Sequence, residues 1–63
     1  MDIGRNIREK RMAVRMSQRE LAQKVDVKQS MICQIESGRK IPNMVLGKQI
    51  ADALGCGLES LVM

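Results

Sequence analysis

The stretch SQRELAQKVDVKQSMICQIESG, residues 17–38, decides the fold of this chain of 63 residues. It opens with Ser17 and, three residues later, Glu20. At this spacing the serine oxygen can accept the backbone N–H of Glu20 while the glutamate side chain accepts the N–H of Ser17, an arrangement called a capping box. We therefore expect a helix to begin at about Gln18.

Apolar residues divide the stretch into two short helices. The first buried stripe consists of Leu21, Ala22 and Val25. The second begins only a few residues later and consists of Met31, Ile32 and Ile35. It ends at Gly38, a residue type that commonly follows the last turn of a helix.

Two helices with so short a link must cross steeply and share one core. The second helix then turns its polar residues outward: Gln29, Ser30, Cys33, Gln34 and Ser37. This is the pattern of a helix-turn-helix over about residues 18–37.

The segments on either side predict further helices. Asp2 can cap a first helix that runs to about Arg15. Its buried stripe would consist of Ile3, Ile7 and Val14, with Gly4 as a mild weakness. We expect the six methionines, in a chain without aromatic residues, to fill the core.

After Gly38 comes a basic loop in which Pro42 prevents a helix from extending backwards. Asn43 is a good N-cap for a fourth helix, which Gly55 would end. Its buried stripe would consist of Leu46, Ile50 and Leu54. A last short helix is expected over about residues 58–62, so the fold class is all-α with five short helices.

Arg11 falls inside the apolar stripe of the first helix. A charge in that position must lie at the edge of the core or be paired. Glu36, next to Ile35, is the acidic residue on the inward side of another helix. We therefore predict a partly buried ion pair between Arg11 and Glu36, and loss of one partner would cost about 3–5 kcal/mol if the pair is well buried.

Size and charge narrow the class of function. At 63 residues the chain is expected to form one domain with a small core. Residues 1–40 carry a net charge of +5, whereas residues 41–63 carry −1. The part with the helix-turn-helix is thus the basic part, which favours a polyanionic partner. Without Phe, Tyr or Trp nothing can stack on unpaired bases, so double-stranded DNA is the better target.

Other classes of protein fit the sequence poorly. The chain has no apolar run near the ~20 residues that span a bilayer and no visible signal peptide, so we expect a cytoplasmic protein without a membrane partner. Cys33 and Cys56 lie in different predicted elements, and with no histidine we expect neither a disulfide nor a metal site. No cofactor or small-molecule ligand is indicated, and we expect no enzymatic activity.

With its helices in this order, the chain resembles the small helix-turn-helix domains of lambdoid phage repressors and Cro proteins, the Xre family. The resemblance covers nearly the whole chain. It rests on Arg11, Ser17-Gln18, Leu21-Ala22, Ile32, Ile35-Glu36, Gly38, Pro42, Ala53-Leu54-Gly55, Leu58 and Leu61, taken together in this order. It implies a lambda-repressor-like domain, and the family's buried ion pair matches Arg11 and Glu36.

The resemblance also implies where DNA is read. The helix of about residues 28–37 would lie in the major groove. The implied base-reading residues are Gln29, Ser30 and Gln34, with Lys28 standing just before them. A glutamine can bond adenine N6 and N7 together, and a serine can pair with several base edges.

Four residues are expected to contact phosphates. Gln18 matches the family's contact at the start of the second helix. Arg39 and Lys40 are implied by their charge and by their place after the reading helix. Asn43 could also reach a phosphate, although capping alone explains it.

The chain departs from the family pattern in the turn. The family often has Ser or Thr as the cap before the reading helix and Gly in the turn, where this chain has Lys28 and Asp26. Either Asp26 and Gln29 form a capping box and the helix starts early, or Asp26 takes the left-handed conformation. The role of Lys28, as base reader or phosphate contact, depends on which alternative holds. Cys33 is interpreted as a small spacer near DNA, with a redox switch as the less favoured alternative.

The sequence thus predicts a DNA-binding transcriptional regulator, specifically a repressor that binds a palindromic operator as a homodimer. Its dimer interface is expected at the end of the chain, at Leu58, Leu61, Val62 and Met63, with core packing as the competing explanation for the two leucines. The alternative function is a protein-interaction module, such as an antitoxin, with secondary DNA binding. An exposed patch around Met12, Met16, Met31 or Met44 would favour that alternative.

Overall fold

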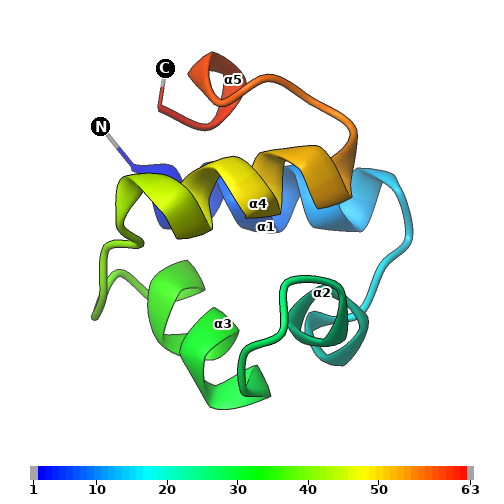
Figure 1. The fold of residues 1–63 in the computed structure, drawn as a ribbon, viewed down its shortest axis with the longest axis vertical. Helices are drawn as coiled ribbons and strands as arrows, with labels where there is room; N and C mark the ends of the chain where they lie inside the picture. The colour runs from blue at the N-terminus through cyan, green and yellow to red at the C-terminus, as the bar shows by residue number, and fades with distance from the viewer. Residues whose placement is uncertain (1, 63) are drawn as a thin grey trace.

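The computed structural model describes residues 2–62, which form five helices and no strand (Figure 1). The helices are α1 (Ile3–Ala13), α2 (Gln18–Lys24), α3 (Gln29–Glu36), α4 (Met44–Leu54) and α5 (Glu59–Val62). The predicted all-α fold of five short helices is confirmed.

Local capping sets where three of the helices begin. The Asp2 side chain accepts the N–H of Arg5 at 3.0 Å, and the Asn43 side chain accepts that of Leu46 at 2.8 Å. The predicted capping box also forms, because the Ser17 hydroxyl accepts the Glu20 N–H at 3.0 Å and the Glu20 carboxylate accepts the Ser17 N–H at 2.9 Å.

The first four helices end in the same way. A left-handed residue follows each of them: Arg15 (φ 57°), Asp26 (φ 56°), Gly38 (φ 84°) and Gly55 (φ 75°). The next N–H in each case reaches back to a carbonyl five residues earlier, as in Met16 to Arg11 at 3.0 Å and Arg39 to Gln34 at 2.9 Å. This is the Schellman motif, which satisfies carbonyl groups that a helix end leaves without partners.

The expected end of α1 at Arg15 is wrong by two residues. Ala13 is the last helical residue, and Arg15 takes the left-handed conformation that glycine usually takes. Val14 was expected in the buried stripe, but it lies past the helix end and is half exposed. The role of Val14 in the core is therefore also a correction.

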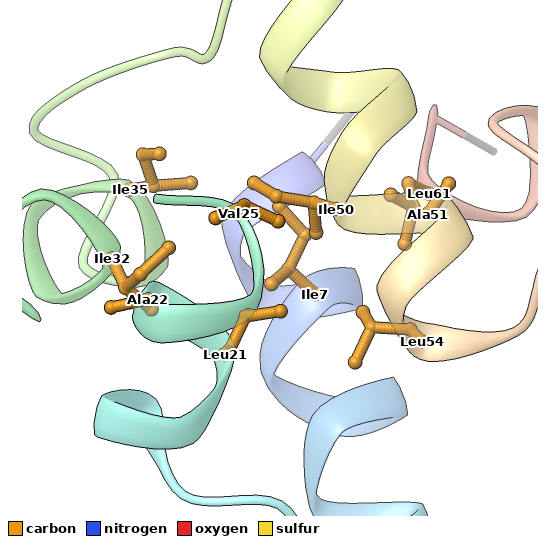
Figure 2. Packing of buried hydrophobic residues seen from close by; sticks show 10 residues of the cluster. All are labelled: Ile7, Leu21, Ala22, Val25, Ile32, Ile35, Ile50, Ala51, Leu54 and Leu61. Atoms are coloured by element: carbon orange, nitrogen blue, oxygen red, sulfur yellow. The ribbon is translucent and has the colours of Figure 1, made fainter. Parts of the chain in front are cut away.

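The core lies where α1 and α4 face the α2–α3 pair (Figures 1 and 2). Its fully buried side chains are Ile7, Leu21, Ile32, Ile35, Ile50 and Leu61. Each of the five helices supplies at least one of them, so no pair of helices holds the fold alone. Met16 and Met31 pack against this core, but Met12 and Met44 are exposed, which corrects the expectation that the methionines fill it.

Gly4 allows α1 to lie directly on the end of α3. A Cβ atom built at this position would overlap the carbonyl oxygen of Ile35 and would stand 3.1 Å from its carbonyl carbon. The glycine that the sequence presents as a weak point of the helix is thus required for the contact between α1 and α3. This contact helps to fix the position of α3 in the domain.

Candidate nucleic-acid interface

α3 has a buried side and an exposed polar side. Ile32 and Ile35 are fully buried, while Gln29, Ser30 and Cys33 are exposed. Gln34 is half-buried. The exposed residues begin at the first turn of the helix, which is the end that a reading helix inserts deepest into the major groove.

The turn between α2 and α3 settles the alternatives that the sequence leaves open. α3 begins at Gln29, and Lys28 is its N-cap in an extended conformation without a side-chain capping bond. Asp26 takes the left-handed conformation, and the Val27 N–H reaches the Ala22 carbonyl at 3.0 Å. The capping box between Asp26 and Gln29 does not form, so Lys28 stands exposed just outside the helix, next to Gln29.

A partly buried polar cluster holds α3 against α1 and α2. The predicted ion pair forms, with Arg11 donating from Nε to Glu36 Oε2 at 2.7 Å and from Nη2 to Glu36 Oε1 at 3.0 Å. The side chains of Arg11 and Glu36 are only 12% and 4% exposed. The hydrogen bond to Glu36 is the main reason why the pKa of Arg11 is raised, and partial burial opposes it.

The same cluster reaches the start of α2. Gln18 Nε2 donates to Glu36 Oε1 at 3.1 Å, and Arg11 Nη1 donates to the Met16 carbonyl at 2.7 Å. Glu36 thus accepts from two other helices at once. Gln18, expected as a phosphate contact, has one amide N–H directed into the protein, so any contact with a phosphate must use the remaining N–H or the backbone.

A polar hollow lies beside this cluster, between α1 and α3. It measures about 300 Å³ and is lined by Arg8, Arg11, Gln18, Cys33, Glu36 and Ser37. Arg8 is not among the residues predicted for the site. Its sequence position carries a signal, because Arg8 lies three residues before Arg11 and therefore on a neighbouring position of the same helical face.

The basic loop after α3 is attached to that helix. The backbone N–H groups of Arg39 and Lys40 both reach the Gln34 carbonyl, at 2.9 and 3.2 Å. Both side chains are exposed. Asn43 is exposed too, but its side-chain oxygen caps α4, in agreement with the alternative that capping alone explains this residue.

The residues expected at the dimer interface divide into three groups. Leu61 is fully buried in the core, and Asn6 Nδ2 donates to its carbonyl at 2.8 Å, in agreement with core packing, the competing explanation for this residue. Leu58 and Val62 are half-buried. Met63 lies outside the described residues.

The two cysteines are free thiols, Cys33 exposed beside the polar hollow and Cys56 half-buried. Among residues 2–62 no group of Cys, Asp or Glu side chains is arranged to hold a metal ion. No helix in the same range combines the length and apolar composition needed to cross a bilayer.

The fold and the exposed face of α3 define a helix-turn-helix domain. A family model described as helix-turn-helix matches residues 7–61. The chain belongs to the helix-turn-helix family of DNA-binding transcription regulators of the Xre and Cro/C1 type.

Two relatives are similar to this chain in sequence. An uncharacterized HTH-type transcriptional regulator of Methanothermobacter thermautotrophicus is 43% identical over 49 residues, which are 78% of this chain and 71% of the relative. Multiprotein-bridging factor 1 of Candida albicans is 38% identical over 59 residues, or 94% of this chain. The chain spans only 39% of the length of that second relative.

Two solved structures share the fold closely. The clp gene regulator ClgR of Corynebacterium glutamicum superposes with a TM-score of 0.94 and 26% identity, over 97% of this chain and 65% of that one. The restriction-modification controller protein C.AhdI of Aeromonas hydrophila gives a TM-score of 0.91 and 28% identity, over 95% of this chain and 91% of that one.

Proposed function

We propose that the protein is a sequence-specific regulator, a repressor that binds a palindromic operator in double-stranded DNA as a homodimer. The observation that carries the proposal is the exposed polar first turn of α3, held in one orientation by the Arg11–Glu36–Gln18 cluster. A rigid reading helix is needed because hydrogen bonds to base edges tolerate little displacement.

In this proposal, specificity comes from Gln29, Ser30 and Gln34, and Lys28 contacts a base or a phosphate at the start of the helix. We assign Gln34 a smaller share of direct contact than Gln29, because Gln34 is half-buried and Gln29 is exposed. Arg39, Lys40 and Gln18 contact the backbone of the duplex, and Asn43 serves mainly as a cap. Two copies would place their reading helices in successive major grooves, about 34 Å apart.

The simplest mechanism of repression is that the dimer covers a promoter. A bound dimer on about two turns of DNA would block polymerase without contacting it.

The test is selection of binding sites from a random duplex pool, followed by a salt titration of the winning sequence. The expected result is a consensus with two equal, inverted half-sites and a steep fall of affinity with salt, because several phosphate contacts release counterions. Weak binding to every duplex without enrichment would contradict the proposal of sequence-specific readout.

The second candidate is a protein-interaction module, such as an antitoxin, in which DNA binding is secondary. The exposure of Met44 and Met12 favours it, because methionine-rich surfaces adapt to partners. The relative named multiprotein-bridging factor 1 also points in this direction. A salt slope near zero, with no selected consensus, would place this candidate first.

A further inference from the structure

The polar hollow of about 300 Å³ between α1 and α3 is lined by a cation that no acid neutralises. This cation is Arg8, which is exposed on α1. In residues 2–62 the ion pairs join Arg5 to Glu9, Arg11 to Glu36 and Lys48 to Asp52, so none of them involves Arg8. The positions one helical turn from Arg8 hold no acid either: they are Gly4, Arg5, Arg11 and Met12.

The other two charges in the lining of the hollow cancel. Arg11 donates to both carboxylate oxygens of Glu36, at 2.7 and 3.0 Å, and its side chain is only 12% exposed. The remaining lining residues are neutral: Gln18, Cys33 and Ser37. Arg8 therefore leaves the lining with a net positive charge. The hollow attracts an anion, because the repulsion from Glu36 is offset by Arg11.

The hollow adjoins the exposed face of α3. Cys33 and Ser37 line it, and both are exposed, one helical turn apart, on that helix. They continue the exposed polar row that begins in the first turn of α3. A helix with its side chains is about 10–12 Å across and the major groove is about 12 Å wide, so the strands at the edges of the groove lie against the sides of the helix. Gln18 lines the hollow from the start of α2, so the strand on that side would meet Arg8 and Gln18 together.

We propose that this hollow binds a phosphate group of the DNA backbone and that Arg8 supplies the charge. The proposal rests on the proposed function, since it adds a contact to the same complex with DNA. A guanidinium group can donate two parallel hydrogen bonds to a phosphate. Arg11 does not take this role, because its Nε and Nη2 groups are bound to Glu36. Gln18 uses one amide N–H for Glu36 and can donate the other to the same phosphate.

The experiment measures binding to a labelled duplex of unrelated sequence by fluorescence anisotropy, at several salt concentrations. One phosphate contact contributes about 0.9 to the salt slope, which corresponds to about eightfold in affinity for a tenfold change in salt. We therefore expect Arg8→Gln to weaken binding by about five- to tenfold at about 0.1 M salt and to lower the slope by about one. Arg8→Lys keeps the charge, so it should keep the slope and lose less affinity.

Lys10→Gln is the matched control. It removes the same charge from the same helix, and Lys10 is exposed and, within residues 2–62, belongs to no ion pair. Two residues along a helix rotate the side chain by about 200°, so Lys10 points away from the hollow. We expect a loss of less than about twofold, because exposed charges further apart than the Debye length of about 10 Å are largely screened. Circular dichroism of each variant checks that the fold is intact.

Equal losses in Arg8→Gln and Lys10→Gln would overturn the proposal, because overall charge would then explain both. A salt slope that Arg8→Gln leaves unchanged would overturn it as well. A titration with inorganic phosphate at constant ionic strength, followed by the NMR signal of the Arg8 Nε–H group, separates the two sources of phosphate. If the losses on DNA are equal, a saturating shift of this signal would assign the hollow to free phosphate instead.

The duplex in this experiment has an unrelated sequence, so the result does not depend on a palindromic operator. A chain that selects no consensus but loses affinity through Arg8→Gln would refute the proposed sequence-specific function and support the phosphate site. A chain that selects a consensus but responds equally to Arg8→Gln and Lys10→Gln would do the reverse. The two failures are therefore distinguishable.

Discussion

The carboxylate of Glu36 accepts hydrogen bonds from Arg11 on α1 and from Gln18 on α2. A buried ion pair of this kind adds little net stability when compared with apolar residues of the same size, because both charges lose their hydration. Its loss is nevertheless costly when only one partner is removed, since the other charge stays behind in a poorly hydrated place.

We expect Glu36→Ala to lower the free energy of unfolding by roughly 3 kcal/mol, measured by urea denaturation. Asp52→Ala is the matched control, because the Lys48–Asp52 pair is about two-thirds exposed and should contribute at most about 0.5 kcal/mol. The double variant Arg11→Met/Glu36→Leu should recover much of the loss. Equal effects of the two alanine variants would contradict the buried role of Glu36.

Single residues are also expected to have different roles in DNA binding, some in contacts with bases and others in contacts with phosphates. We expect Gln29→Ala to weaken binding to the selected operator by roughly 1–3 kcal/mol while binding to unrelated duplexes changes little. Arg39→Ala should weaken both about equally and lower the salt slope by about one. Titrations of both variants on both duplexes measure this, and identical behaviour of the two would refute the assignment.

Among the helices, the contact between α1 and α3 depends on Gly4, which has no side chain. Gly4→Ala should lower the free energy of unfolding by about 1–3 kcal/mol, because the added methyl group would push α1 away from the Ile35 carbonyl. Gly47→Ala is the control, since its Cβ would meet only the Leu58 side chain at 3.4 Å and alanine favours the helix by up to about 1 kcal/mol. Thermal unfolding of both variants distinguishes the effect of packing from that of helix propensity. Stabilisation by Gly4→Ala would contradict the close contact between α1 and α3.

The start of α2 should be sensitive to acid. The pKa of Glu20 is lowered, chiefly by the hydrogen bond that its carboxylate accepts from the Ser17 backbone N–H. A carboxyl group whose pKa is lower in the folded state contributes stability above its unfolded pKa of about 4.3, and this contribution is lost as the pH falls through the folded value.

Glu20→Gln keeps the geometry of the capping box without the titrating group. We expect wild type to lose more stability than this variant between pH 7 and pH 3, as followed by urea midpoints. Parallel loss in the two proteins would show that the acid sensitivity arises elsewhere.

The starts and ends of the helices show which features of the fold could be predicted from the sequence. The starts of α2 and α4 were predictable because Ser17, Glu20 and Asn43 act within three residues of themselves. Gly38 and Gly55 likewise mark the ends of their helices. Arg15 gives no such local signal, because arginine seldom takes the left-handed conformation. The next residue, Met16, packs against the core, and its carbonyl accepts a hydrogen bond from Arg11.

The candidate site likewise has features that could be predicted from the sequence and features that could not. The Arg11–Glu36 pair could be inferred, because a charge inside an apolar stripe needs a partner. The link from Gln18 to the same carboxylate and the place of Arg8 beside it depend on how three helices meet, which spacing along the chain does not give. Leu61 shows a further limit, since an apolar pattern is the same whether the residue packs in its own core or against a second copy.

The whole molecule separates two kinds of surface. Lys28, Arg39 and Lys40 are exposed around α3, whereas the exposed side chains of Ile41, Met44 and Val45 near the start of α4 are apolar. In the proposed dimer, each reading helix belongs to one compact domain with Cα extents of 24 × 23 × 19 Å, so the distance between the two helices should be fixed rather than adjustable.

This rigidity leads to a prediction about the operator. Insertion of about five base pairs between the half-sites rotates one of them to the opposite face of the duplex, because a turn of B-DNA takes about 10–10.5 base pairs. We expect the affinity to fall to that of a single half-site, measured by fluorescence anisotropy on labelled duplexes. Undiminished affinity for the expanded site would indicate that the two copies bind independently.

The division of α3 into a buried stripe and an exposed polar row bears on how such a protein can change over generations. Exchange of Gln29, Ser30 or Cys33 removes nothing from the hydrophobic core, so the cost to folding is small. A duplicated gene could therefore acquire a preference for a new control region through a few codon changes while its product keeps folding. Ile32 and Ile35, on the opposite side of the same helix, would meanwhile remain under constraint, so the two sides of one short helix would evolve at different speeds.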